Sequence, residues 1–193
     1  KQAEAVLRDL AAHPATATHI ATKLARHFSG DTPPPALVER LAADFRSTGG
    51  DLPSLYRTLI DSPEPWAGEP TMFKSPWDWM VSTMRALKLP ALGEKQNIPA
   101  LFTQLGQPVW RPGSPAGYDD LVATWAGSAA LMQRVELASR IAGRIGDRAD
   151  ARALAPQILA DALTPDTAQA IARADSPGQG LAMLLASPAF LRR

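Results

Sequence analysis

The chain has 193 residues, enough for one well-buried core or for two lobes that share an interface. Its 20 Lys and Arg residues and 19 Asp and Glu residues leave a formal charge of +1, so we expect no nucleic-acid partner. The absence of cysteine excludes disulfides and thiolate metal sites but leaves the redox compartment open. The longest apolar run, residues 181–186, is far shorter than the ~20 residues of a spanning helix, so no transmembrane segment is expected.

Proline placement predicts the fold class. The 18 prolines are about twice the average usage of ~5%. Several follow a plausible N-cap, as in Ser75-Pro76 and Ser176-Pro177, where the missing N–H has no helical partner. Sustained strand-like alternation is absent, and Ala, Leu and Arg are helix formers. The sequence therefore predicts an all-α fold, a multi-helix orthogonal bundle of about ten short helices.

Apolar residues at helical spacing predict four helices before residue 66. They cover residues 2–12, 14–29, 36–46 and a segment that Asp51 caps. The residues expected to face inward are, in chain order, Ala5, Val6, Leu10, Ala17, Ile20, Ala21, Leu24, Phe28, Leu37, Val38, Leu41, Ala42, Phe45, Leu52, Leu55, Leu59 and Ile60. The chain opens inside a helical pattern without an initiator methionine, so we expect a piece of a longer protein.

Two histidines on the polar face of the second helix raise the question of a metal site. His19 and His27 are two turns apart, ~12 Å along the axis. Zinc needs each nitrogen at ~2.0–2.1 Å, so one ion cannot reach both without strong distortion. We expect a solvated polar face here, and we predict no metal and no cofactor.

A second group of helices is predicted after residue 74. Ser75 caps residues 76–88, a short helix covers 99–104, and Ser128 caps the longest helix, which runs to residue 145. Residues 150–154, 156–163 and 165–174 follow, and a capping box at Ser176 and Gln179 opens the last helix. The expected inward stripes are Trp77, Trp79, Met80, Val81, Met84 and Leu87, and Leu131, Met132, Val135, Ala138, Ile141, Ala142 and Ile145.

Arginines follow the other side of the longest predicted helix. They are Arg134, Arg140, Arg144 and Arg148. Such a ridge can bind phosphates, but Glu136, Asp147 and Asp150 interleave with it. A solvated face with ion pairs is the preferred interpretation.

A short internal similarity bears on domain organisation. Residues 52–66 and 178–192 each place a leucine-rich helix before Ser-Pro, with Trp66 or Phe190 just beyond. Convergence on the same helix-stop chemistry explains this as well as a repeat does. We expect a single helical domain, residues 1–193. Residues 1–66 and 74–193 are candidate sub-lobes within it, and the proline- and glycine-rich loop up to residue 73 is the candidate boundary between them.

The long Pro/Gly-rich loop at 105–120 is the candidate site. Residues 105–125 read LGQPVWRPGSPAGYDDLVATW, with rings and polar groups on irregular backbone between two helical patterns. A cleft there would be lined by Lys74, Gln107, Trp110, Arg111, Tyr118, Asp119 and Trp125. Such a set suits a saccharide, a peptide or a loop of a partner protein. Alternatively, the rings clamp the loop onto the helices and Asp119 caps the next helix.

An enzyme is the other hypothesis. All three histidines fall within residues 13–27, far in sequence from Ser114, and no nucleophile-elbow pattern is present. Asp119 and Asp120 are adjacent, so on a helix their side chains point apart. No catalytic residue is assigned, and enzyme status stays open.

Four segments in fixed order carry a family resemblance. They are HPATATHIATKLARHF, FRSTGGDLPSLYRTLIDSPEPW, FKSPWDWMVSTMRALKL and LGQPVWRPGSPAGYDD-x4-W. Together they resemble the C-terminal half of the bacterial domain-of-unknown-function 1800 (DUF1800) family, which more often carries tryptophan at the position of Tyr118. The resemblance implies a helical protein, often exported and so periplasmic or secreted, and frequent gene neighbourhood with an exported sulfatase-like family.

The resemblance also bounds the functional hypotheses. It implies no activity, cofactor or catalytic residue, because none is established for the family. The preferred hypothesis is a binding or interaction module, with a nearby-encoded sulfatase-like protein or a saccharide or peptide as its partner. The alternative is part of a hydrolase-like enzyme whose remaining site residues lie in a missing N-terminal half.

Overall fold

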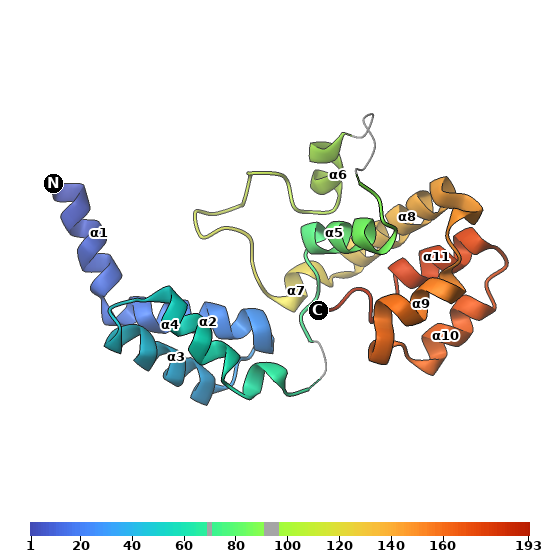
Figure 1. The fold of residues 1–193 in the computed structure, drawn as a ribbon. Helices are drawn as coiled ribbons and strands as arrows, with labels where there is room; N and C mark the ends of the chain where they lie inside the picture. The colour runs from blue at the N-terminus through green and yellow to red at the C-terminus, as the bar shows by residue number, and fades with distance from the viewer. Residues whose placement is uncertain (69–70, 91–96) are drawn as a thin grey trace. The chain divides into compact units, whose positions relative to one another are not determined.

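Helices make up most of the described part of the chain. The computed structural model describes residues 1–68, 71–90 and 97–193. Within these ranges there are eleven α-helices and three short 3₁₀ helices, with one isolated antiparallel bridge between Phe73 and Arg192 (Figure 1). This confirms the all-α prediction. None of the described helices is long and apolar enough to cross a membrane.

The chain divides into two compact units. Unit 1 is Lys1–Met72 and unit 2 is Phe73–Arg193. The expected single domain with sub-lobes 1–66 and 74–193 stays a prediction. Parts of the predicted boundary loop and of the predicted break after residue 90 lie outside the described residues.

Unit 1 contains four α-helices and one 3₁₀ helix. Their bounds are α1 Gln2–Ala12, α2 Pro14–Ser29, α3 Pro35–Ser47, α4 Leu52–Ile60 and η1 Glu64–Trp66. α3 packs on both α2 and α4, and its Leu37 and Leu41 are fully buried between them. The predicted cap is confirmed: the Asp51 side chain accepts from the Ser54 N–H at 2.9 Å.

Several predicted inward residues of unit 1 are exposed. α1 has no buried residue, and Val6 and Leu10 are both more than half exposed. Phe28, Leu52 and Ile60 are exposed as well. These residues lie at helix ends or on α1, where no neighbouring helix of the described chain covers the apolar face. Helical periodicity identifies an apolar face, but it does not determine whether another element covers that face.

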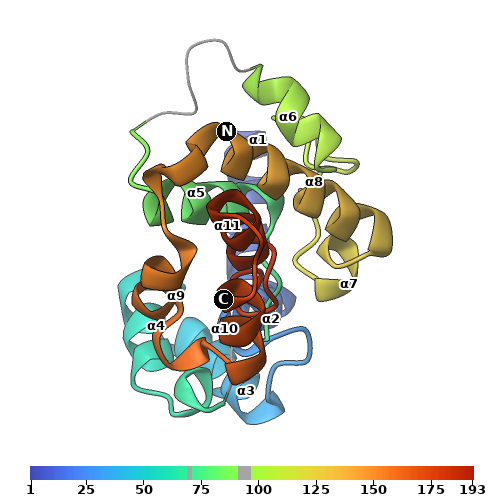
Figure 2. The ribbon, with the colours of Figure 1, turned by 90° about the vertical axis from the view of Figure 1, so that its right-hand side faces the viewer.

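Unit 2 contains the other helices. Their bounds are α5 Pro76–Ala86, α6 Ile98–Gln104, α7 Val122–Trp125, α8 Ser128–Ile145, η2 Gly146–Arg148, α9 Ala151–Leu159, η3 Ala160–Ala162, α10 Pro165–Ala172 and α11 Pro177–Leu185. α11 packs on α8, α9 and α10 (Figure 2). Leu181, Leu184 and Leu185 of α11 are fully buried at these contacts.

α5 begins with the predicted cap. Ser75 accepts from the Asp78 N–H at 3.1 Å, and the Asp78 carboxylate accepts from the Ser75 N–H at 3.3 Å, which completes a capping box. The predicted inward stripe is confirmed for Trp79 and Met80 but is wrong for Trp77. Trp79 and Met80 are buried, whereas Trp77 is 56% exposed and stacks against Phe102 with ring centroids 5.3 Å apart.

Ser75→Ala should therefore lower the free energy of unfolding by about 1 kcal/mol, because one orphan N–H of α5 loses its acceptor. Ser128 offers a matched control, since it starts α8 without a capping bond and is exposed. Ser128→Ala should change the free energy by less than about 0.5 kcal/mol. Urea unfolding followed by circular dichroism measures both; equal losses would contradict the capping assignment.

α8 differs from its prediction at the start and on its faces. Gly127, not Ser128, is the N-cap residue, because Gly127 has extended backbone angles and Ser128 is already the first residue of α8. The buried face contains Arg134, Leu137, Ala138 and Ala142, while Val135 is exposed. The predicted exposure of Arg134 is therefore wrong: the side chain lies on the i, i+4, i+8 line of Ala138 and Ala142.

One helix replaces two predicted ones at Pro156. α9 runs through this proline, which cannot donate to the carbonyl of Arg152. Ala151, Ala155 and Leu159 keep one buried line on both sides of it. At α11, Ser176 accepts from the Gln179 N–H as predicted, but the Gln179 side chain accepts from the N–H of Asp175 rather than that of Ser176.

Candidate functional site

The 105–121 loop connects α6 to α7 and is fastened at its base (Figure 1). The Tyr118 hydroxyl donates to the Pro108 carbonyl, which joins the two arms of the loop. The Trp125 Nε1–H donates to the Asp119 carbonyl at 3.0 Å, and the Tyr118 and Trp125 rings lie 6.2 Å apart. Trp125 is 5% exposed and belongs to the core of unit 2.

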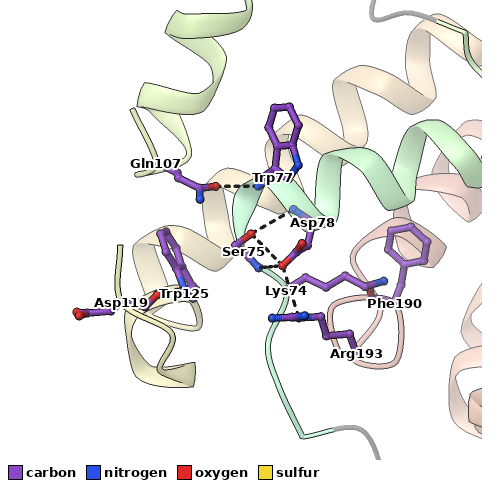
Figure 3. A network of polar contacts seen from close by, with 9 residues as sticks. All are labelled: Lys74, Ser75, Trp77, Asp78, Gln107, Asp119, Trp125, Phe190 and Arg193. Atoms are coloured by element: carbon purple, nitrogen blue, oxygen red, sulfur yellow. Dashed lines mark hydrogen bonds and ion pairs between the residues drawn. The ribbon is translucent and has the colours of Figure 1, made fainter. Parts of the chain in front are cut away.

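A further contact connects the loop to α5. The Gln107 Oε1 accepts from the Trp77 main-chain N–H at 2.9 Å (Figure 3). This N–H is one of the first four of α5 and has no acceptor within the helix. Gln107 therefore fixes the start of the loop to a helix N-terminus.

The contacts of Tyr118 and Trp125 are those expected of rings that clamp a loop. The proposed cap by Asp119 is wrong, because Leu121 is the N-cap residue of α7 and makes no side-chain capping bond. The Asp119 carboxylate is instead exposed and accepts from the Thr124 hydroxyl at 3.3 Å. The Tyr118 and Trp125 rings therefore hold the base of the loop, and the turn at its far end is exposed.

Trp110 and Arg111 form that turn. The Arg111 N–H donates to the Pro108 carbonyl at 3.3 Å, and Trp110 has a positive φ of 57°. This backbone region is strained for a bulky side chain. The Trp110 side chain is 95% exposed, and Arg111 is exposed too.

Lys74 makes its contacts elsewhere in unit 2. Its Nζ donates to the Phe190 carbonyl at 2.7 Å and lies 4.5 Å from the centre of the Phe190 ring (Figure 3). The Lys74 N–H donates to the Leu191 carbonyl at 2.8 Å. The seven predicted residues therefore separate into three groups. Residues at the base of the loop form the first, the exposed turn with Trp110 and Arg111 is the second, and Lys74 lies apart from both.

The environment of Lys74 lowers the pKa of its ammonium group to about 8. Burial is the largest cause, Asp78 opposes it, and the positive charges of Arg134 and Arg193 add to it. Asp78 itself accepts from the Ser75 hydroxyl at 3.0 Å and pairs with Arg193 at 3.5 Å (Figure 3).

Stability should rise with pH because of this lysine. The unfolded chain holds the Lys74 proton up to a pKa of 10.5, whereas the folded chain releases it at about 8. Between these values the unfolded state binds more protons, so the free energy of unfolding increases with pH. Urea unfolding of wild type and Lys74→Met at pH 7.5, 9 and 10.5 measures the difference; parallel pH profiles would contradict it.

Arg134 is not among the residues that the sequence predicts for a site, but its environment is unusual. The side chain is 1% exposed, and its guanidinium carbon lies 4.6 Å from the centre of the Phe73 ring. Burial lowers the pKa of Arg134 to about 10, and Asp78 opposes this. Arg134 is spaced four and eight residues from Ala138 and Ala142, which places it on the buried face of α8. The sequence nevertheless predicted a solvated position for it, because the residue is charged.

One hollow of unit 2 lies away from the predicted residues. Its volume is about 190 Å³, and it is lined by residues of α9, by Ile171 of α10, by the 174–176 segment between α10 and α11, and by the start of α11. The described residues contain no group of three His, Asp or Glu side chains placed to hold a metal ion. In unit 1 the His13 side chain accepts from the Ala15 N–H at 3.1 Å, which is a capping role.

A family model described as protein of unknown function (DUF1800) matches residues 1–192. The chain belongs to the DUF1800 family. This confirms the resemblance that the four sequence segments predicted. The match takes in every helix of the DUF1800 chain and the whole 105–121 loop. No curated protein and no solved structure matches the chain.

Proposed function

We propose that this DUF1800 chain is a binding module that presents Trp110 to a partner protein. The observation that supports the proposal is the 95% exposure of this tryptophan on a loop with a fastened base. A large ring in water has no stabilising role in the chain itself. In a partner's pocket it would bury its apolar surface.

The loop base supports the proposal because it limits the cost of binding. Tyr118, Trp125 and Gln107 hold both arms through bonds to Pro108, Asp119 and α5. Prolines 108 and 112 flank the turn and restrict its backbone further. A preorganised turn loses less conformational entropy on binding than a free one.

The composition of the turn favours a protein over other ligands. Val109 is 38% exposed beside Trp110, and Arg111 is exposed on its other side. Tryptophan and arginine are the residues that most often dominate protein–protein binding energy. Under this proposal, the exported sulfatase-like protein suggested by the resemblance is the first partner to test, in a periplasmic or secreted setting.

Trp110→Ala should abolish partner capture without changing stability. We expect a change below about 0.5 kcal/mol in the free energy of unfolding, because the ring has no core contact. Met132→Ala is the control, since Met132 is an exposed apolar residue on α8 in the same unit. Quantitative affinity capture from the native host measures the amount of partner bound by wild type, Trp110→Ala and Met132→Ala.

Two outcomes would contradict the proposal. Equal capture by wild type and Trp110→Ala would remove Trp110 from recognition. Binding to a saccharide array that Trp110→Ala loses would make the ligand a sugar instead of a protein. The alternative of a hydrolase-like enzyme stays a prediction from the sequence, and no contact among the described residues favours it over binding.

A further inference from the structure

The buried guanidinium of Arg134 has no acceptor in the described part of the chain. Its Nε, Nη1 and Nη2 atoms are all buried, and none hydrogen-bonds to a described residue. An arginine side chain has five N–H donors and stays protonated in proteins. Burying such a charge without acceptors is among the most costly arrangements in a fold.

The ring of Phe73 compensates only one aspect of this burial. Its centre lies 4.6 Å from the guanidinium carbon, which is a cation–π contact. A ring offers the positive charge its π electrons but supplies no oxygen acceptor for the five N–H donors. These donors still need oxygen acceptors.

The carboxylate of Asp78 already has other partners. Asp78 accepts from the Ser75 N–H and hydroxyl, and it pairs with Arg193 at 3.5 Å. The negative charge of Asp78 raises the pKa of Arg134 against the effect of burial, although no hydrogen bond joins the two side chains. Lys74 and Arg193 add two further positive charges to this region, since the charges of Arg134 and Arg193 both act on Lys74 and Asp78 opposes them.

We propose that this cationic cluster, defined as Lys74, Arg134 and Arg193, binds an oxyanion whose oxygens accept from the Arg134 guanidinium. A carboxylate or a phosphate group provides two oxygens at the spacing of the guanidinium fork. Because the Arg134 donors are buried, the anion would have to enter beside the partly exposed Asp78 and Arg193 side chains, which are 35% and 32% exposed. The proposal is independent of Trp110, because it uses other residues of unit 2.

Titration of the whole chain with inorganic phosphate and, separately, with acetate tests the site. Isothermal titration calorimetry at pH 7 and constant ionic strength in chloride measures the dissociation constant for each. Saturable binding of phosphate alone assigns a phosphate group, and saturable binding of acetate assigns a carboxylate. We expect Arg134→Met to weaken that binding at least tenfold.

Arg140→Met is the matched control. Arg140 lies on the same helix but is exposed, and its Nη2 donates to Gln104 at 3.2 Å. It should bind the anion as wild type does. If Arg134→Met does not fold, Lys74→Met tests the same cluster from its partly exposed side and should weaken binding too. Absence of saturable binding in wild type, or equal binding by all variants, would overturn the proposal.

Discussion

Trp79→Ala should lower the free energy of unfolding by about 3–5 kcal/mol. Trp79 is 0% exposed, and its Nε1–H donates to the Leu185 carbonyl at 2.9 Å. This bond joins α5 to α11 across 106 residues of sequence. The substitution therefore leaves a large cavity and an unpaired buried carbonyl at the same place. Urea unfolding monitored by circular dichroism measures the loss.

Trp77→Ala is the control for that result. Trp77 lies on the same helix, but its ring is 56% exposed and contacts Phe102 at one side only. Because less apolar surface leaves a packed environment, we expect a loss below about 1.5 kcal/mol. A larger loss for Trp77 than for Trp79 would mean that Trp77 is the more deeply buried tryptophan of α5, contrary to the structure.

Arg134→Met should raise the free energy of unfolding by about 1–3 kcal/mol in chloride buffer. Methionine fills similar apolar space without burying N–H donors that lack acceptors among the described residues. The substitution also removes the cation–π contact with Phe73, which costs ~2 kcal/mol or less. This cost offsets only part of the stability gained by no longer burying those donors. Urea unfolding in chloride, without added phosphate or carboxylate, measures the difference.

Arg140→Met separates this effect from a general effect of removing charge. Arg140 is exposed on the same helix, so its replacement should change the free energy by less than about 0.5 kcal/mol. A loss of stability in Arg134→Met under the same conditions would show that the guanidinium is already satisfied. That result would also count against the oxyanion site.

Local chemistry explains why the helix boundaries could be predicted. An N-cap bond forms between residues three apart, so Asp51, Ser75 and Ser176 identify their helix starts without any tertiary contact. Pro156 misled the prediction for the opposite reason. A proline removes one helical bond, and the buried line of Ala151, Ala155 and Leu159 outweighs that loss through packing that the local sequence does not display.

The buried face of a helix depends on its neighbours, and this limited the site prediction. In α5 both Trp77 and Trp79 fit an apolar stripe, but α11 supplies the acceptor for Trp79 only. In α8, Arg134 is buried, and its guanidinium lies against the ring of Phe73, which is 61 positions earlier in the sequence. The loop rings were found from sequence because aromatic residues stand out between prolines. Their division into a buried base and an exposed Trp110 required the structure.

Site-specific photo-crosslinking at position 110 tests the central claim most directly. A benzoylphenylalanine in place of Trp110 in the native host would be compared with the same group in place of Met132. We predict a discrete protein adduct at position 110, competed by the untagged wild-type chain, and none at position 132. Adducts of equal yield at both positions, or none at position 110, would contradict the assignment of this loop as the recognition surface.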